Sequence, residues 1–195
     1  MARNRIREQF EEEFWEAHLS KIALPEDVLE KVITWSRNPQ YILFFCSNPG
    51  AGKTYLTAAM ANDWEERKIP WRRFDERQLL SHLRNGIKEN VDYEYELKRL
   101  CDCPFFILDD LGTAKQTDFQ KEIMFDFVDI RWSSRKPTII TSNLTIDCLG
   151  EYFGDRFVSR MKDARNTVIE FSDIDKRLNR NVGNDGNFND NPENV

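Results

Sequence analysis

A phosphate-binding loop is encoded by residues 47–54, which read SNPGAGKT. The stretch matches the pattern G-x-x-x-x-G-K-[ST] at every defined position except the first, where Ser47 replaces glycine. Gly52 allows the backbone to approach a phosphate group, and consecutive N–H groups at a helix start form an anion site. Lys53 is expected to reach the β- and γ-phosphates, and the Thr54 hydroxyl to bind Mg²⁺. We therefore predict a nucleotide site made of Asn48, Pro49, Gly50, Ala51, Gly52, Lys53, Thr54 and Tyr55.

The sequence on both sides of this loop supports the same interpretation. The run YILFFC at 41–46 is short and apolar, which is typical of a buried strand. From 53 to 68 apolar residues recur at helical spacing (Leu56, Ala59, Met60 and Trp64). A Gly-Lys-Thr occurring by chance in a surface turn would not have this context. Strand, glycine loop and helix form the arrangement in which this motif binds a nucleotide.

Two neighbouring acids provide a second candidate site. The run FFILDDLG at 105–112 predicts an apolar strand that ends in Asp109 and Asp110. A carboxylate at the carboxyl end of a strand, beside a phosphate loop, can hold Mg²⁺ and its waters, which we assign to Asp109. Asp110 then points the opposite way and is placed to polarise an attacking water. The alternative is an Asp-Asp pair that only begins a turn.

The composition limits the class of protein. The chain has 195 residues, 40% hydrophobic and 32% charged, which suits one globular domain with its own core. No apolar run approaches the roughly 20 residues of a membrane span, so we expect a cytoplasmic protein without a membrane partner. The four cysteines have no zinc-like spacing and are interpreted as reduced structural thiols. The net charge of −6 argues against non-specific coating of nucleic acid but leaves room for a local basic track.

Strand-like and helical segments alternate along most of the chain. Strands are predicted at 41–46, 70–74, 104–109, 137–142 and 167–171, and helices near 53–68, 75–88, 93–101, 117–134 and 154–163. This alternation predicts an α/β fold in three layers, with a five-stranded parallel sheet and no separate helical lid. We divide the chain into an N-terminal extension of two helices (1–36), a core (37–177) and a polar, disordered tail (178–195).

Four motifs together resemble a known family. SNPGAGKT, FFILDDLG, PTIITSNL and GDRFVSRM occur in the order and spacing of the AAA+ ATPases of the DnaC/DnaI helicase-loader and IstB transposition-helper group, over roughly residues 35–175. The resemblance implies ATP and Mg²⁺ as ligands and head-to-tail self-association. It also implies that Asn143 is sensor I, which orients the lytic water, and that Arg160 is an arginine finger for the neighbouring subunit. Arg156 is either a second sensor or, preferably, a salt-bridge partner. Arg131 and Arg177 are further candidates at the subunit junction.

Three departures from the family pattern affect what can be transferred. Ser47 replaces the first glycine of the loop but removes no phosphate ligand. Asp110 stands where many AAA+ proteins have glutamate, and its shorter reach predicts slower hydrolysis. Helicase loaders carry an N-terminal helicase-binding domain, whereas only the segment 1–36 precedes the core here, so the partner is the least defined feature.

The segment 71–99 is a candidate contact for single-stranded DNA. It combines cations with aromatic residues, and in related initiators and loaders a helical insertion here follows single-stranded DNA. The residues concerned are Arg72, Arg73, Arg77, Arg84, Lys88, Lys98, Arg99, Tyr93 and Tyr95. The alternative is a solvated helix face, because six acids in the same segment balance the charge. We expect binding to require ATP and assembly.

Three functions remain open from the sequence. The first is an ATP-hydrolysing loader that places a replicative helicase on single-stranded DNA. The second is an IstB-like helper of transposition that uses the same ATPase machinery. The third is an adaptor that binds ATP for its shape and hardly hydrolyses it.

Overall fold

A single parallel sheet forms the centre of the molecule. The computed structural model describes residues 5–22, 24–88, 92–113 and 117–171. The strands are β1 (Ile42–Ser47), β2 (Trp71–Asp75), β3 (Phe105–Leu111), β4 (Thr138–Ser142) and β5 (Thr167–Phe171). They are parallel and lie in the order β2-β3-β4-β1-β5. All five predicted strands are present with small shifts at their ends, which confirms the predicted parallel sheet.

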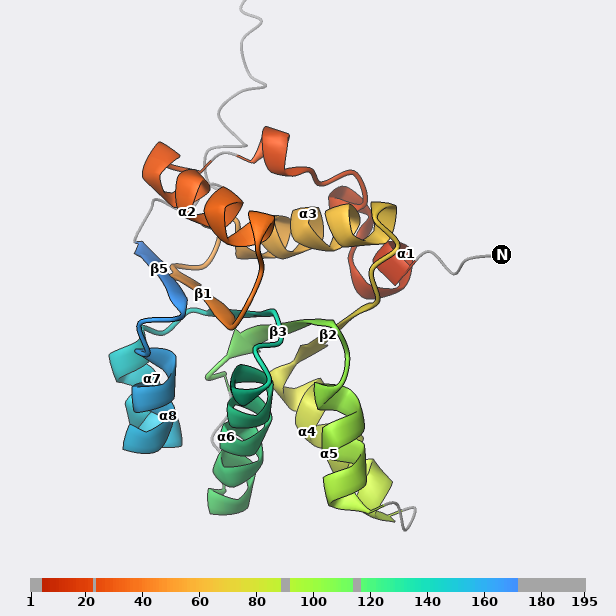
Figure 1. Cartoon of the computed structure of the whole chain (residues 1–195), viewed down its shortest axis with the longest axis vertical. Helices are drawn as coiled ribbons and strands as arrows, with labels where there is room; N and C mark the ends of the chain where they lie inside the picture. Colours follow the sequence, from red (N-terminus) through yellow and green to blue (C-terminus); the bar gives the residue numbers. More distant parts are fainter. Residues whose placement is uncertain (1–4, 23, 89–91, 114–116, 172–195) are drawn as a thin grey trace, which may run out of the picture.

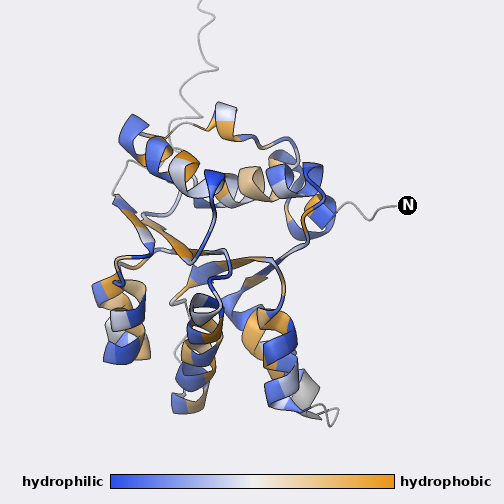
Figure 2. Ribbon diagram, viewed as in Figure 1, coloured by the Kyte–Doolittle hydropathy of each residue, from blue (hydrophilic) through white to orange (hydrophobic). Residues whose placement is uncertain are grey.

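Helices cover both faces of the sheet and complete the three layers (Figure 1). One layer contains α1 (Arg5–Gln9), α2 (Glu26–Arg37) and α3 (Lys53–Glu66), with two short 3-10 turns, η1 (Glu12–Phe14) and η2 (Leu19–Lys21). The other contains α4 (Glu76–Lys88), α5 (Tyr93–Cys101), α6 (Asp118–Ser133), α7 (Ile146–Phe153) and α8 (Asp155–Met161). Figure 2 shows strand β1 in hydrophobic colours, as expected for a strand buried on both faces, while the helices also carry hydrophilic residues.

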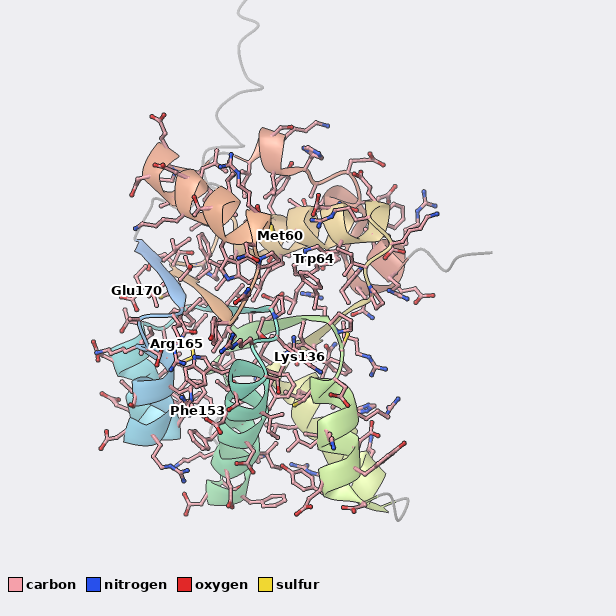
Figure 3. All side chains as sticks on the ribbon, in the orientation of Figure 1. Met60, Trp64, Lys136, Phe153, Arg165 and Glu170 are labelled. Carbon is pink, nitrogen blue, oxygen red and sulfur yellow. The ribbon has the colours of Figure 1, made fainter. Side chains whose placement is uncertain are left out.

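The core is divided by the sheet into two apolar clusters. Met60 and Trp64 of α3 belong to one cluster, and Phe153 of α7 belongs to the other (Figure 3). Alternate residues of β1 point to opposite sides, since Leu43 lies in the first cluster and Phe44 in the second. In the described part of the chain, none of the helices has both the length and the apolar character needed to cross a membrane.

The helical predictions are confirmed for the central helices and need two corrections. The capping box of α6, formed by Thr117 and Gln120, is present as predicted. Helix α7 is not predicted by the sequence patterns, because it is short and contains Gly150. That glycine allows close packing, since a Cβ there would lie 2.9 Å from Val158 of the next helix.

The N-terminal segment is also less regular than predicted. Instead of one continuous first helix, it forms α1, η1 and η2 and lies along α3. Asn62 of α3 holds it by donating hydrogen bonds to the carbonyls of Trp15 (3.2 Å) and Ala17 (2.8 Å). Phe10 is buried and Phe14 is partly buried against the same cluster, so both aromatic residues pack on the core as expected. The predicted tail at 178–195 lies outside the described residues.

Candidate functional site

The loop between β1 and α3 has the conformation that its glycines allow. Gly50 and Gly52 have φ values of 83° and 103°, in the left-handed region that favours glycine. Gly52 caps the N-terminus of α3, and its carbonyl accepts the N–H of Leu56 at 2.9 Å. The first N–H groups of a helix have no acceptor within the helix, so this end of α3 has the form of an anion site.

Lys53 is held inside this loop. Its ammonium group donates to the carbonyls of Ser47 (2.7 Å) and Asn48 (3.1 Å), and lies 3.4 Å from the Ser47 hydroxyl. Ser47 is buried at the end of β1. The residue that replaces the first glycine of the motif therefore helps to position the lysine.

A cavity of about 790 Å³ opens above the loop. Every residue from Pro49 to Tyr55 lines it, together with Arg73, Asp110 and Asn143. Its other wall is the N-terminal segment, including Phe10, Phe14, Lys21, Ile22 and Leu24. Asn48, predicted with the loop, is exposed and is not among the lining residues; it contributes its carbonyl to Lys53. The structure thus brings most of the predicted nucleotide site to one cavity with a partly apolar wall.

The two acids of β3 point in different directions, as predicted. Asp110 lines the cavity, whereas Asp109 is buried behind it. Two residues of β3 oppose one of β4 at this point, because Leu108 pairs with Ile140 and Leu111 with Ser142. This is the geometry of a β-bulge, and Asp110 accordingly has a φ of 54°.

The hydroxyl of Thr141 holds the pair together. It accepts the Asp110 N–H at 3.0 Å and donates a short hydrogen bond to Oδ1 of Asp109. Burial, together with the charge of Asp109, raises the pKa of the Asp110 carboxyl. A raised pKa makes this carboxylate a stronger base than an ordinary aspartate.

The oxygen atoms around the loop suit a magnesium ion. Mg²⁺ takes oxygen ligands, keeps several waters and is usually bound by one or two protein groups plus phosphates. Thr54 and Asp110 both line the cavity. Asp109 is a fitting donor by chemistry, but its Oδ2 accepts two N–H groups of Arg73, at 2.5 Å and 3.1 Å.

The predicted arginines of the subunit junction lie in different environments. Arg160 of α8 is not among the residues lining the cavity; its guanidinium is ion-paired with Asp129 and lies 3.7 Å from the ring centre of Trp132. Arg156 lies over the ring of Phe125 at 4.3 Å, a contact different from the salt bridge favoured by the sequence.

The structure corrects the prediction that Arg131 lies at the subunit junction. This arginine is completely buried and donates four hydrogen bonds inside the protein, three of them to backbone carbonyls. A side chain in this position supports the fold and cannot meet a neighbouring subunit. Arg177, the other junction candidate, lies outside the described residues.

The candidate DNA-contact segment also needs correction. Arg73 points into the site, and Tyr93 is half-buried against α6 with its hydroxyl enclosed, so neither is available to nucleic acid. Arg99 is exposed but paired with Glu96. Arg77 and Arg84 of α4 and Tyr95 and Lys98 of α5 are exposed.

Sequence reasoning missed three residues that complete the site. The sequence places Arg73 in the basic segment and Thr141 inside a strand, and neither position by itself indicates a contact with the two acids. Glu76, the first residue of α4, is buried and accepts the N–H groups of Gly112 (2.6 Å) and Thr113 (3.2 Å), just beyond the end of β3 that carries the two acids. Arg73 lies in the middle of β2, where it pairs with Ile107, two residues before Asp109 on β3. This register is a signal, because residues two apart on a strand point to the same face of the sheet.

Comparison with known proteins agrees with this geometry. Residues 23–164 match the family described as IstB-like ATP binding protein. The chain belongs to this family. Members are ATP-binding proteins by that description, which fits the loop and cavity described above.

Individual helicase loaders are similar to this chain in sequence and in structure. The replicative helicase loader DnaC of Escherichia coli (strain K12) is 25% identical over 129 residues, which is 66% of this chain and 53% of that protein. The replicative helicase loader DnaI of Bacillus subtilis (strain 168) is 27% identical over 112 residues, 57% of this chain and 36% of that protein. A crystal structure of the DnaC helicase loader is 26% identical, with a TM-score of 0.69, and the match covers 82% of this chain and 100% of that one. The chain spans about half the length of the DnaC relative it matches.

Proposed function

We propose that this protein binds and hydrolyses ATP and acts, like DnaC, as a loader of a replicative helicase. The observation that carries the proposal is the convergence of Lys53, Thr54, Asp110 and Asn143 on one cavity. They come from α3 and from the ends of β3 and β4. Membership of the IstB-like family and the likeness to DnaC support the same conclusion.

Each residue at the cavity has a chemical task in this proposal. The N–H groups of the loop and the Lys53 ammonium bind phosphate oxygens, while the apolar side chains of the N-terminal wall receive the base. Thr54 and Asp109 would hold Mg²⁺, which neutralises phosphate charge when bound. Asp110 and Asn143 orient the attacking water, and the raised pKa of Asp110 suits it to accept a proton.

Arg160 completes the site of a neighbouring subunit in this proposal. Arg160 is not among the residues that line its own subunit's cavity, which is consistent with action in trans, and its ion pair with Asp129 must open first. ATP turnover per subunit should therefore rise with protein concentration. Mixing inactive Lys53→Ala with inactive Arg160→Ala should restore part of the activity, since one mixed junction keeps both groups. The absence of rescue would remove the trans role.

Single-stranded DNA would contact the outer face of α4 and α5. Arg77 and Arg84 are seven residues apart and so lie on one side of α4, and Tyr95 is 63% exposed. Replacing both arginines by alanine should lower the salt dependence of DNA binding by the ATP-bound assembly by about two counterions. An unchanged salt dependence would mean that these arginines belong to an ordinary solvated helix face and do not contact DNA.

The partner is identified by affinity capture with an Asp110→Asn variant in the presence of ATP. Recovery of a hexameric replicative helicase, followed by direct binding of the purified helicase, supports the loader. Recovery of a transposase favours the IstB-like function, for which the family match over 23–164 is the specific observation. Tight ATP binding with negligible turnover, at high protein and DNA concentration, would favour the adaptor.

A further inference from the structure

Arg73 connects the two walls of the cavity. From the middle of β2, its Nε and Nη2 atoms donate to Oδ2 of Asp109, at 3.1 Å and 2.5 Å. Its remaining nitrogen, Nη1, donates to the Gln9 carbonyl at 2.7 Å, and its guanidinium lies 4.6 Å from the ring centre of Phe10. One side chain thus joins a buried carboxylate to the start of the N-terminal segment.

These contacts neutralise Asp109 with a cation. The Asp109 side chain is only 4% exposed and that of Arg73 only 20% exposed, and a buried carboxylate requires a cation or donors of this kind. A divalent ion that binds to Asp109 would meet the guanidinium at the same oxygen. Two cations at one carboxylate oxygen repel each other, so binding of one weakens binding of the other.

We propose that Arg73 couples the cation site to the N-terminal segment: Mg²⁺ that enters with a nucleotide competes with the guanidinium for Asp109 and loosens residues 5–10. The inference rests on the proposed nucleotide function. Arg73 itself lines the cavity, so a displaced guanidinium has room to turn toward phosphate groups. Without the Asp109 contact, the guanidinium is no longer fixed in the position from which it donates to Gln9 and stacks on Phe10.

The effect is confined to the first part of the segment. Residues 15–18 have separate attachments to α3, because Asn62 holds the carbonyls of Trp15 and Ala17, and the His18 N–H donates to the Tyr55 hydroxyl at 3.3 Å. Residues 5–10 are held by Arg73, by the burial of Ile6 and Phe10, and by the Trp15 indole, which donates to the Phe10 carbonyl at 3.0 Å. Of these attachments, only Arg73 contacts Asp109. This difference provides an internal reference for an experiment.

Hydrogen exchange of the full chain, read by mass spectrometry, tests the coupling. The three conditions are EDTA alone, a non-hydrolysable ATP analogue with EDTA, and the same analogue with Mg²⁺. We expect Mg²⁺ to speed exchange in residues 5–10 about tenfold, as loss of a charge-assisted hydrogen bond would. Exchange in residues 15–18 should stay constant.

Arg73→Lys and Arg72→Lys form a matched pair of variants. Lysine at 73 keeps the charge beside Asp109 but cannot reach both Asp109 and Gln9, so residues 5–10 should exchange fast in every condition. Arg72 is its neighbour on β2 and points to the other face, so its variant should respond like the wild type. If Arg73→Lys does not fold, Phe10→Leu replaces it, because this variant weakens the stacking on Phe10 but keeps both Arg73 and Asp109. Exchange in residues 5–10 should then be faster than in the wild type without Mg²⁺ and should rise further when Mg²⁺ is added.

Binding of a fluorescent ATP analogue is measured in the same samples to separate the two proposals. Analogue binding without any Mg²⁺ effect on residues 5–10 in the wild type overturns the coupling and leaves the nucleotide function intact. An Mg²⁺ effect that persists in Arg73→Lys also overturns it. Failure of the analogue to bind overturns both.

Discussion

Replacement of Arg131 by methionine tests whether this arginine has the structural role described above. Burial lowers the pKa of its guanidinium to about 10, so the group is still charged at neutral pH. It donates to the carbonyls of Cys101 (2.9 Å), Cys103 (2.7 Å) and Pro137 (2.6 Å) and to the Thr138 hydroxyl (2.7 Å). These groups belong to the α5–β3 and α6–β4 connections, which the arginine therefore ties together.

The cost of the replacement follows from the acceptors that it leaves. The Pro137 carbonyl still accepts the N–H of Phe106, and the Thr138 hydroxyl still donates to the Lys136 carbonyl. The carbonyls of Cys101 and Cys103 lose a charged donor. With about 1–3 kcal/mol for each orphaned buried group, we expect the free energy of unfolding to fall by about 4 kcal/mol. This is a large share of the roughly 5–15 kcal/mol that stabilises a typical domain.

Urea unfolding followed by circular dichroism measures this difference. Arg77→Met is the matched control, because Arg77 is exposed on α4 and its replacement should change stability by no more than about 0.5 kcal/mol. A fall in the free energy of unfolding of less than about 1 kcal/mol for Arg131→Met would refute the structural role and reopen a role at the subunit junction.

Three further changes test other parts of the structure. Hydrogen bonds from Arg99, and then His82, lower the pKa of Glu96 to about 2. Its contribution to stability is therefore present above about pH 4.5 and is lost as the pH falls toward 2. Acid unfolding of Glu96→Gln should lack this loss of stability. Gly112→Ala should destabilise the protein by roughly 1–3 kcal/mol, because φ is +88° and a Cβ would lie 2.7 Å and 2.8 Å from two leucine side chains, as thermal unfolding can show. Thr117→Ala removes the capping box of α6 and should cost about 1 kcal/mol in the same assay, whereas Thr117→Ser should be nearly neutral.

The strands and the loop were predictable because their signals are local. A parallel strand buried on both faces is an apolar run, and the glycine loop carries its own pattern of residue types. Helix α7 lacked such a signal, since Gly150 lowers its helical character and the reason for that glycine is the neighbouring helix α8. The first helix was overestimated because Ile6, Phe10 and Phe14 have helical spacing, although the chain turns between them.

The charged residues of the site were harder to predict because their partners are distant in the sequence. Arg73 and Arg131 both look like surface cations in a charged chain. Their partners are Asp109 for the first and backbone carbonyls for the second, and only the packing of strands and helices brings these groups together. Thr141 acquires its role from the bulge in β3, which no pattern of residue types reveals.

The position of Trp132 has an optical consequence. Its indole ring has the guanidinium of Arg160 at 3.7 Å and that of Arg165 at 4.0 Å from its centre. The emission of an indole depends on the charges at its face, so departure of Arg160 toward another subunit would change the fluorescence of this tryptophan. If Arg160 acts in trans as proposed, Trp132 is an intrinsic fluorescent probe of that assembly.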